Sequence, residues 1–204
     1  MKHIYIDKNA NYTFLTLHGT GADENDLIPL VNYLNPNYNI LSPRGNVNEN
    51  GLNRFFKRHG MGNYDIPNLI EETNNLKEFI VTSKESYKLN IDNIIGLGFS
   101  NGANILESLL QLDGPLIKTA VLLSPVLLQP NVDFKDLKGV NIFIATSDND
   151  PYVKNKENDI LIEKLKNANA NVYVHKHHLG HQINETVLND LRTWLSKLTK
   201  KESF

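Results

Sequence analysis

A serine flanked by two glycines, Gly98-Phe99-Ser100-Asn101-Gly102, stands where an apolar run ends and a helical pattern begins. The apolar run is Ile94-Ile95-Gly96-Leu97, and the helical pattern is Ile105, Leu106, Leu109 and Leu110. A serine on a sharp strand-to-helix turn can hold its hydroxyl clear of a sheet, because a glycine on either side has no Cβ to collide there. The pattern therefore predicts an exposed nucleophile at Ser100; the simpler alternative is a glycine-rich turn with a helix-capping serine.

The rest of the chain alternates between strand and helix patterns. We expect strands at residues 3–7, 13–17, 38–42, 93–98, 118–123, 140–146 and 171–176, and helices at 24–35, 65–86, 101–112, 156–168 and 184–199. This alternation predicts an α/β protein with a mainly parallel, seven-stranded sheet and helices on both faces. The short connection at residues 8–11 predicts an antiparallel first strand at the sheet edge. The acidic residues at 23–26 are expected to cap the first helix.

Polar groups follow several of the expected strands. The strand at 140–146 leads into a loop that contains Asp148 and Asp150, the last strand leads to His181, and residues 14–17 lead into His18-Gly19-Thr20-Gly21. Functional groups gather at the carboxyl ends of parallel strands, and the chain order serine, acid, histidine is the order of one class of serine hydrolases. We therefore expect His181 to serve as the base, with Asp150 or Asp148 as its acidic partner.

On these motifs the chain resembles the phospholipase/carboxylesterase group of the α/β-hydrolase superfamily, which includes acyl-protein thioesterases. Ser42-Pro43-Arg44-Gly45 and Arg54-Phe55-Phe56 resemble the bacterial branch with hydrolases of the MhqD type. The resemblance spans nearly the whole chain and implies an α/β-hydrolase fold. It implies the catalytic residues Ser100, Asp150 and His181, with the acid placed directly before proline. It also implies an oxyanion hole formed by the backbone N–H groups of Thr20 and Asn101.

Two loops are expected to shape the substrate pocket. Residues 43–64 are too long for a simple connector, and long ordered loops at the carboxyl ends of strands are usually functional. Phe55 and Phe56 are candidates to line the pocket from this loop, and Leu127 is a candidate from residues 124–130; the alternative is that the phenylalanines form a small core that pins the loop. No insertion is long enough for a large lid, which favours small ester substrates.

Composition limits the remaining possibilities. The chain has 204 residues, which suits one domain at 1–204, and its net charge of −2 argues against a nucleic-acid partner. It has no cysteine, so neither a disulfide nor a thiol nucleophile is available. No apolar run suggests a membrane span or a signal peptide, and we expect a cytoplasmic protein. A homodimer is compatible with the sequence, which leaves the oligomeric state open.

The histidines at 175, 177, 178 and 181 raise the question of a zinc site. We expect surface histidines there instead, with no metal and no cofactor. The resulting prediction is a carboxylesterase that cleaves short-chain or aryl esters through an acyl-enzyme on Ser100. The alternatives are a thioesterase that acts on acyl thioesters or acylated proteins, and a non-catalytic homologue that binds a small molecule.

Overall fold

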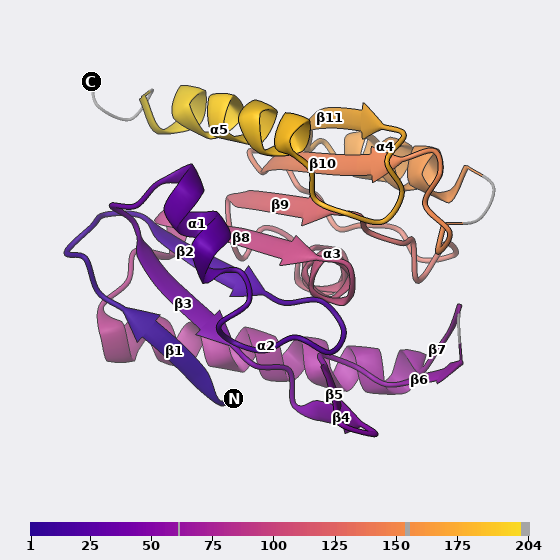
Figure 1. The fold of residues 1–204 in the computed structure, drawn as a ribbon, viewed down its shortest axis with the longest axis horizontal. Coiled ribbons are helices and arrows are strands. Elements are labelled where there is room, and N and C mark those ends of the chain that lie inside the picture. The colour runs from indigo at the N-terminus through magenta and orange to yellow at the C-terminus, as the bar shows by residue number, and fades with distance from the viewer. Residues whose placement is uncertain (61, 154–155, 201–204) are drawn as a thin grey trace.

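The computed structural model describes residues 1–60, 62–153 and 156–200. Its centre is a seven-stranded sheet in the order β1-β3-β2-β8-β9-β10-β11 (Figure 1). The strands are β1 (His3–Ile6), β2 (Thr13–Leu17), β3 (Asn39–Pro43), β8 (Ile94–Phe99), β9 (Thr119–Leu123), β10 (Asn141–Ser147) and β11 (Asn171–His177). The predicted seven-stranded α/β architecture is therefore confirmed.

All pairings in this sheet are parallel except that of β1, which lies antiparallel at the edge as expected. Its partner is β3 and not the next strand along the chain, so residues 8–11 do not form a hairpin. The side chain of Asn39 holds this connection by accepting hydrogen bonds from the backbone N–H groups of Lys8 and Ala10.

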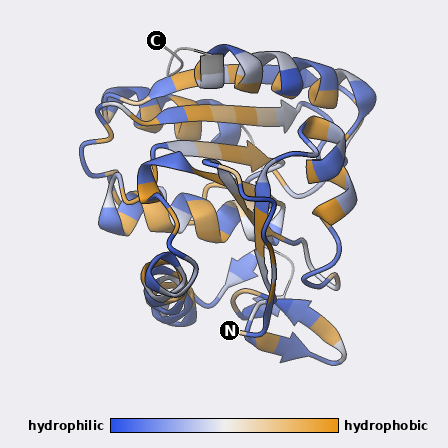
Figure 2. Ribbon diagram, turned by 90° about the vertical axis from the view of Figure 1, so that its left-hand side faces the viewer, coloured by the Kyte–Doolittle hydropathy of each residue, from blue (hydrophilic) through white to orange (hydrophobic). Residues whose placement is uncertain are grey.

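Helices cover both faces of the sheet. They are α1 (Ile28–Leu34), α2 (Ile66–Tyr87), α3 (Asn101–Asp113), α4 (Glu157–Asn167) and α5 (Glu185–Lys200), with a short 3-10 turn at Ile91–Asn93. Successive strand residues are buried on opposite faces: Phe143 and Ala145 pack with α1 and α5, whereas Ile142 and Ile144 pack with α2, α3 and α4. This two-sided burial explains why the central strands are apolar at nearly every position (Figure 2).

The first helix is shorter than expected. It begins at Ile28, and no acidic side chain caps it. Glu24 is buried, and both its carboxylate oxygens accept hydrogen bonds from Arg44, with a further ion pair to Lys2 at 3.0 Å. The acidic segment therefore ties the loop after β2 to the loop after β3, and the predicted capping role was wrong.

The segment between β3 and α2 contains two small hairpins that the sequence pattern did not predict. Strands β4 (Val47–Glu49) and β5 (Leu52–Arg54) form the first, and β6 (Arg58–Gly60) and β7 (Asn63–Tyr64) form the second. Strands of two or three residues are too short to show a periodic apolar pattern. Figure 1 places both hairpins beside α2, below the main sheet as drawn.

Candidate active site

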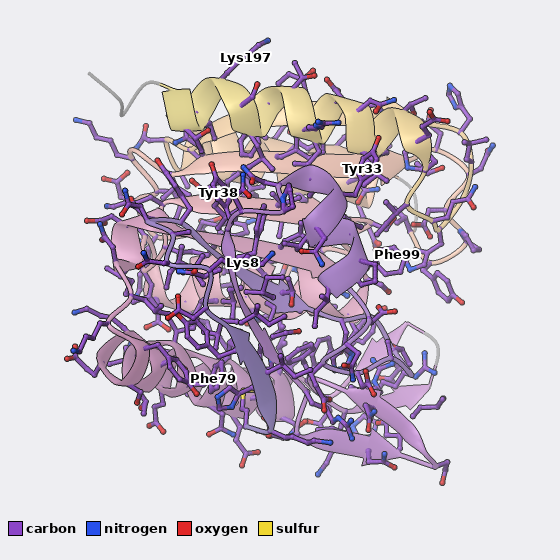
Figure 3. The ribbon with its side chains drawn as sticks, turned by 60° about the vertical axis from the view of Figure 1, so that its left-hand side comes forward. Lys8, Tyr33, Tyr38, Phe79, Phe99 and Lys197 are labelled. Carbon is purple, nitrogen blue, oxygen red and sulfur yellow. The ribbon has the colours of Figure 1, made fainter. Side chains whose placement is uncertain are left out.

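Ser100 lies on a strained turn between β8 and α3, with φ 53° and ψ −114°. The two flanking glycines are required by close backbone approaches. A Cβ on Gly98 would lie 2.4 Å from the carbonyl oxygen of Gly102, and a Cβ on Gly102 would lie 1.9 Å from that of Leu17. Phe99, labelled in Figure 3, marks the end of β8 where this turn begins. The turn has the geometry of a nucleophile elbow.

Three side chains from distant parts of the chain form a continuous chain of hydrogen bonds. The Nε2 atom of His181 is 2.8 Å from the Oγ of Ser100, and its Nδ1 is 2.7 Å from the Oδ2 of Asp150. Asp150 is buried, and its other oxygen accepts a hydrogen bond from the backbone N–H of Tyr152. The rings of Phe99 and Tyr152 lie against the imidazole, with centroids at 5.3 and 4.6 Å. Hydrogen bonds at both nitrogens and contacts with two aromatic rings therefore fix the position of the imidazole.

Asp148 and Asp150 follow the same strand but lie in different environments. The side chain of Asp148 is 58% exposed and faces that of His178 at 3.2 Å. The backbone N–H of Asp148 donates to the carbonyl of His177, and the hydroxyl of Ser147 accepts a hydrogen bond from the N–H of Gly180. These bonds join the loops after β10 and β11, which places Asp150 within reach of His181.

Two backbone N–H groups converge near the serine without an acceptor. The N–H of Asn101 belongs to the first residue of α3, where no helical carbonyl is available, and the N–H of Thr20 follows β2. Neither donates a hydrogen bond to any residue that the structure describes. Both residues line the same cavity as Ser100. The pair is therefore available to an oxygen atom of a bound molecule.

The loop that carries Thr20 is held from two sides. The Nδ1 of His18 donates to the carbonyl of Gly19 (2.7 Å), and its Nε2 accepts from the N–H of Gly45 (3.1 Å). Burial lowers the pKa of His18, which keeps the ring neutral and able to accept that bond. On the other side, the Nη1 of Arg54 donates to the hydroxyl of Thr20 at 2.6 Å.

A cavity of about 440 Å³ opens beside Ser100. Its wall includes both predicted oxyanion residues and Val126, which belongs to the loop at 124–130 that was expected to shape the pocket. Four further lining residues were not selected as pocket residues from the sequence: Arg54, Arg58, Tyr64 and Tyr152. Phe55 and Phe56 are fully buried in the core, and Leu127 is nearly so; none of the three lines the cavity. The proposed pocket role of these three residues is therefore corrected: Phe55 and Phe56 belong to the main hydrophobic core, and Arg54 and Arg58 of the same segment line the cavity instead.

The remaining histidines form no recognisable metal centre. Within residues 1–60, 62–153 and 156–200, no three side chains of histidine or acidic residues are arranged to hold a metal ion. The Nδ1 of His175 instead pairs with Asp190 at 2.7 Å. Among the same residues, no helix has the length and apolar character needed to cross a bilayer.

Comparisons with known proteins identify the family of the chain. The phospholipase/carboxylesterase family model matches residues 4–199. The chain is 36% identical over 194 residues to the hydrolase MhqD of Bacillus subtilis. The aligned region covers 95% of this chain and 97% of that protein.

Solved structures resemble the chain over almost its whole length. A Bacillus cereus carboxylesterase matches with a TM-score of 0.92 and 39% identity, covering 97% of this chain and 94% of that one. The structure of YahD with malic acid matches with a TM-score of 0.90 and 27% identity, covering 96% and 98%. The sheet, its helices and these matches lead to one conclusion: the chain belongs to the phospholipase/carboxylesterase family and has the α/β-hydrolase fold.

Proposed function

We propose that this hydrolase-family protein is a serine carboxylesterase with the catalytic residues Ser100, His181 and Asp150. The observation that carries the proposal is the continuous hydrogen-bonded path from the Ser100 hydroxyl through the imidazole to a buried carboxylate. A serine hydroxyl is a weak nucleophile until an adjacent base accepts its proton. The 2.8 Å separation supports His181 as that base.

The reaction follows from this arrangement in two steps. In the first, the Oγ of Ser100 attacks the ester carbonyl while the Nε2 of His181 accepts the hydroxyl proton. His181 then gives this proton to the departing alcohol, and an acyl-enzyme remains. In the second, His181 takes a proton from water, the resulting hydroxide attacks the acyl group, and the carboxylic acid leaves as Ser100 recovers its proton. Asp150 keeps the tautomer of His181 fixed and stabilises the imidazolium.

The oxyanion that forms in each step needs hydrogen-bond donors. The backbone N–H groups of Thr20 and Asn101 are unengaged and line the cavity, which supports their role in stabilising that charge. One such donor lowers the barrier by about 3–4 kcal/mol. A backbone donor does not depend on the side chain, so the function is compatible with the residues found at both positions.

The cavity volume supports a small acyl or alcohol group as the substrate. A space of about 440 Å³ lies within the range of small-molecule sites. The YahD relative was solved with malic acid, a small compound with two carboxyl groups, which supports small polar molecules as ligands of this group of proteins. Long acyl chains are not part of the proposal.

A fluorophosphonate probe tests the nucleophile. Wild-type protein should be labelled at Ser100, and Ser100→Ala should not. Labelling that persists in Ser100→Ala, or no labelling of the folded wild-type protein, contradicts the proposal.

A series of 4-nitrophenyl esters then tests substrate size: kcat/KM should be highest for short acyl chains, and a maximum at long chains would contradict the size assignment. The same acyl groups presented as thioesters distinguish an esterase from a thioesterase.

A further inference from the structure

We propose that the cavity beside Ser100 selects esters that carry a free carboxylate, and that Arg58, together with Arg54, binds this carboxylate. The inference rests on the proposed esterase activity and adds the chemical class of its substrate. Both arginines line the cavity. Arg54 comes from the first and Arg58 from the second of the two small hairpins between β3 and α2. These hairpins would therefore supply the residues that determine substrate specificity.

Arg54 is buried but still lines the cavity. The residue is only 2% exposed; its Nε donates to the carbonyl of Phe56, and its Nη1 donates to the hydroxyl of Thr20. A guanidinium has five N–H groups, and the contacts described for Arg54 engage only its Nε and Nη1. Its Nη2 is not among the buried atoms that lack a partner, and the residue lines the cavity, so this end of the guanidinium is accessible from the cavity. A bound anion would supply an acceptor there.

Arg58 adds a second positive charge that the protein neutralises poorly. Glu49 is the only acidic side chain, within the described part of the chain, that pairs with either arginine, and it serves both. Its Oε2 lies 3.5 Å from the Nε of Arg54 and 3.9 Å from that of Arg58, beyond the 2.7–2.9 Å of a strong charged hydrogen bond. Burial and then the positive charge of Arg58 lower the pKa of Arg54.

A neutral donor lies on the same wall. The hydroxyl of Tyr64 lines the cavity and makes no hydrogen bond within the described residues. Burial raises the pKa of Tyr64, so the phenol stays protonated and can donate. Two guanidinium groups and a phenol are therefore available to a single carboxylate.

The other acidic side chains near the cavity do not neutralise the positive charges of Arg54 and Arg58. Asp26 lines the cavity but is exposed and forms no ion pair with Arg54 or Arg58 in the described structure. Asp150 is already engaged by His181. Asp26 also borders an open apolar groove with Leu30 and Ile183. The carboxylate should therefore lie at the Arg58 side, and neutral apolar groups at the Asp26 side.

Matched ester pairs test this selectivity. In one pair the charge is on the acyl side: mono-4-nitrophenyl adipate and its methyl-capped analogue. In the other it is on the alcohol side: 4-acetoxybenzoate and its methyl ester. The readout is the ratio of kcat/KM for the charged ester to that for its neutral partner, corrected for uncatalysed hydrolysis. This ratio is independent of the fraction of folded enzyme, so a partly unfolded variant remains interpretable.

Arg58→Gln should lower the ratio about tenfold in at least one pair, the loss expected for one charged hydrogen bond. Arg58→Glu should lower it further. Lys57→Gln is the matched control, because Lys57 is an exposed neighbour that does not line the cavity and its loss changes the net charge equally; its ratio should stay at the wild-type value. An unchanged ratio in Arg58→Gln for both pairs, or an equal fall in Lys57→Gln, overturns the inference. Failure of the esterase proposal itself looks different: neither ester of a pair is cleaved, or Ser100→Ala cleaves both.

Discussion

The side-chain oxygen of Asn101 accepts a 2.7 Å hydrogen bond from the backbone N–H of Phe55. The residue after the candidate nucleophile therefore anchors the segment that carries Arg54 and Arg58. Its backbone N–H meanwhile donates to no residue that the structure describes. Asn101 thus contributes a side-chain contact that holds the cavity wall and a backbone N–H that belongs to the proposed oxyanion hole.

Asn101→Ala separates these two roles. The variant keeps the backbone donor but leaves the N–H of Phe55 buried without an acceptor, which should cost about 1–3 kcal/mol of stability. Because the cavity wall shifts while the serine and its base remain, we expect KM to rise more than kcat falls. Thermal unfolding and steady-state kinetics on a short 4-nitrophenyl ester measure both effects. A fall in kcat alone, with normal stability, would argue against the anchoring role.

Asp150→Asn and Asp148→Asn form a matched pair for the acidic member of the site. Only Asp150 contacts His181, whereas Asp148 faces solvent and His178. Asp150→Asn should lower kcat by roughly four orders of magnitude, because the neutral amide no longer fixes the histidine tautomer. Asp148→Asn should keep kcat within a fewfold of wild type. Equal losses in the two variants would remove the assignment of Asp150.

The positions of the seven main strands along the chain and the chain order of the three polar residues could be predicted because both leave strong signals in the sequence. Two-sided burial makes β8 and β10 continuous apolar runs, and the glycines at 98 and 102 are required by backbone contacts. The cavity wall left no such signal. Phe55 and Phe56 looked like pocket residues, yet their side chains are in the core and the polar Arg54 and Arg58 line the cavity. Which side of a two- or three-residue strand faces a cavity depends on tertiary packing, not on periodicity.

The ion pair of Glu24 predicts a loss of stability at acidic pH. Burial alone would raise the pKa of this carboxyl, but hydrogen bonds from Arg44 and Lys2 outweigh burial and lower its pKa to about 2. The folded state therefore binds this proton less readily than the unfolded chain. The stabilisation is fully present above the ordinary pKa of about 4.5 and is lost as the pH falls towards 2.

Glu24→Gln should accordingly lower the free energy of unfolding at pH 7 by about 1–3 kcal/mol. The difference from wild type should shrink between pH 4.5 and pH 2, the interval bounded by the ordinary and the lowered pKa of Glu24. Urea unfolding at several pH values measures this, with Glu85→Gln as the control because that side chain is 75% exposed. If the variant remains less stable than wild type by the same amount down to pH 2, the charge of the Glu24 carboxylate is not the cause of the difference.

Glu107 on α3 gives a pH effect of opposite sign. It is fully buried, and burial raises its pKa well above the ordinary value, although a hydrogen bond from the backbone N–H of Leu128 partly opposes this shift. The folded protein therefore holds a proton that the unfolded chain releases above pH 4.5, so stability falls as the pH rises from there towards the folded-state pKa. Glu107→Gln cannot ionise but keeps an acceptor for Leu128. Its stability relative to wild type should therefore improve steadily from pH 4 to pH 8 in urea unfolding, a trend that Glu85→Gln should not show. If the difference between Glu107→Gln and wild type stays constant across this range, Glu107 does not retain its proton in the folded protein.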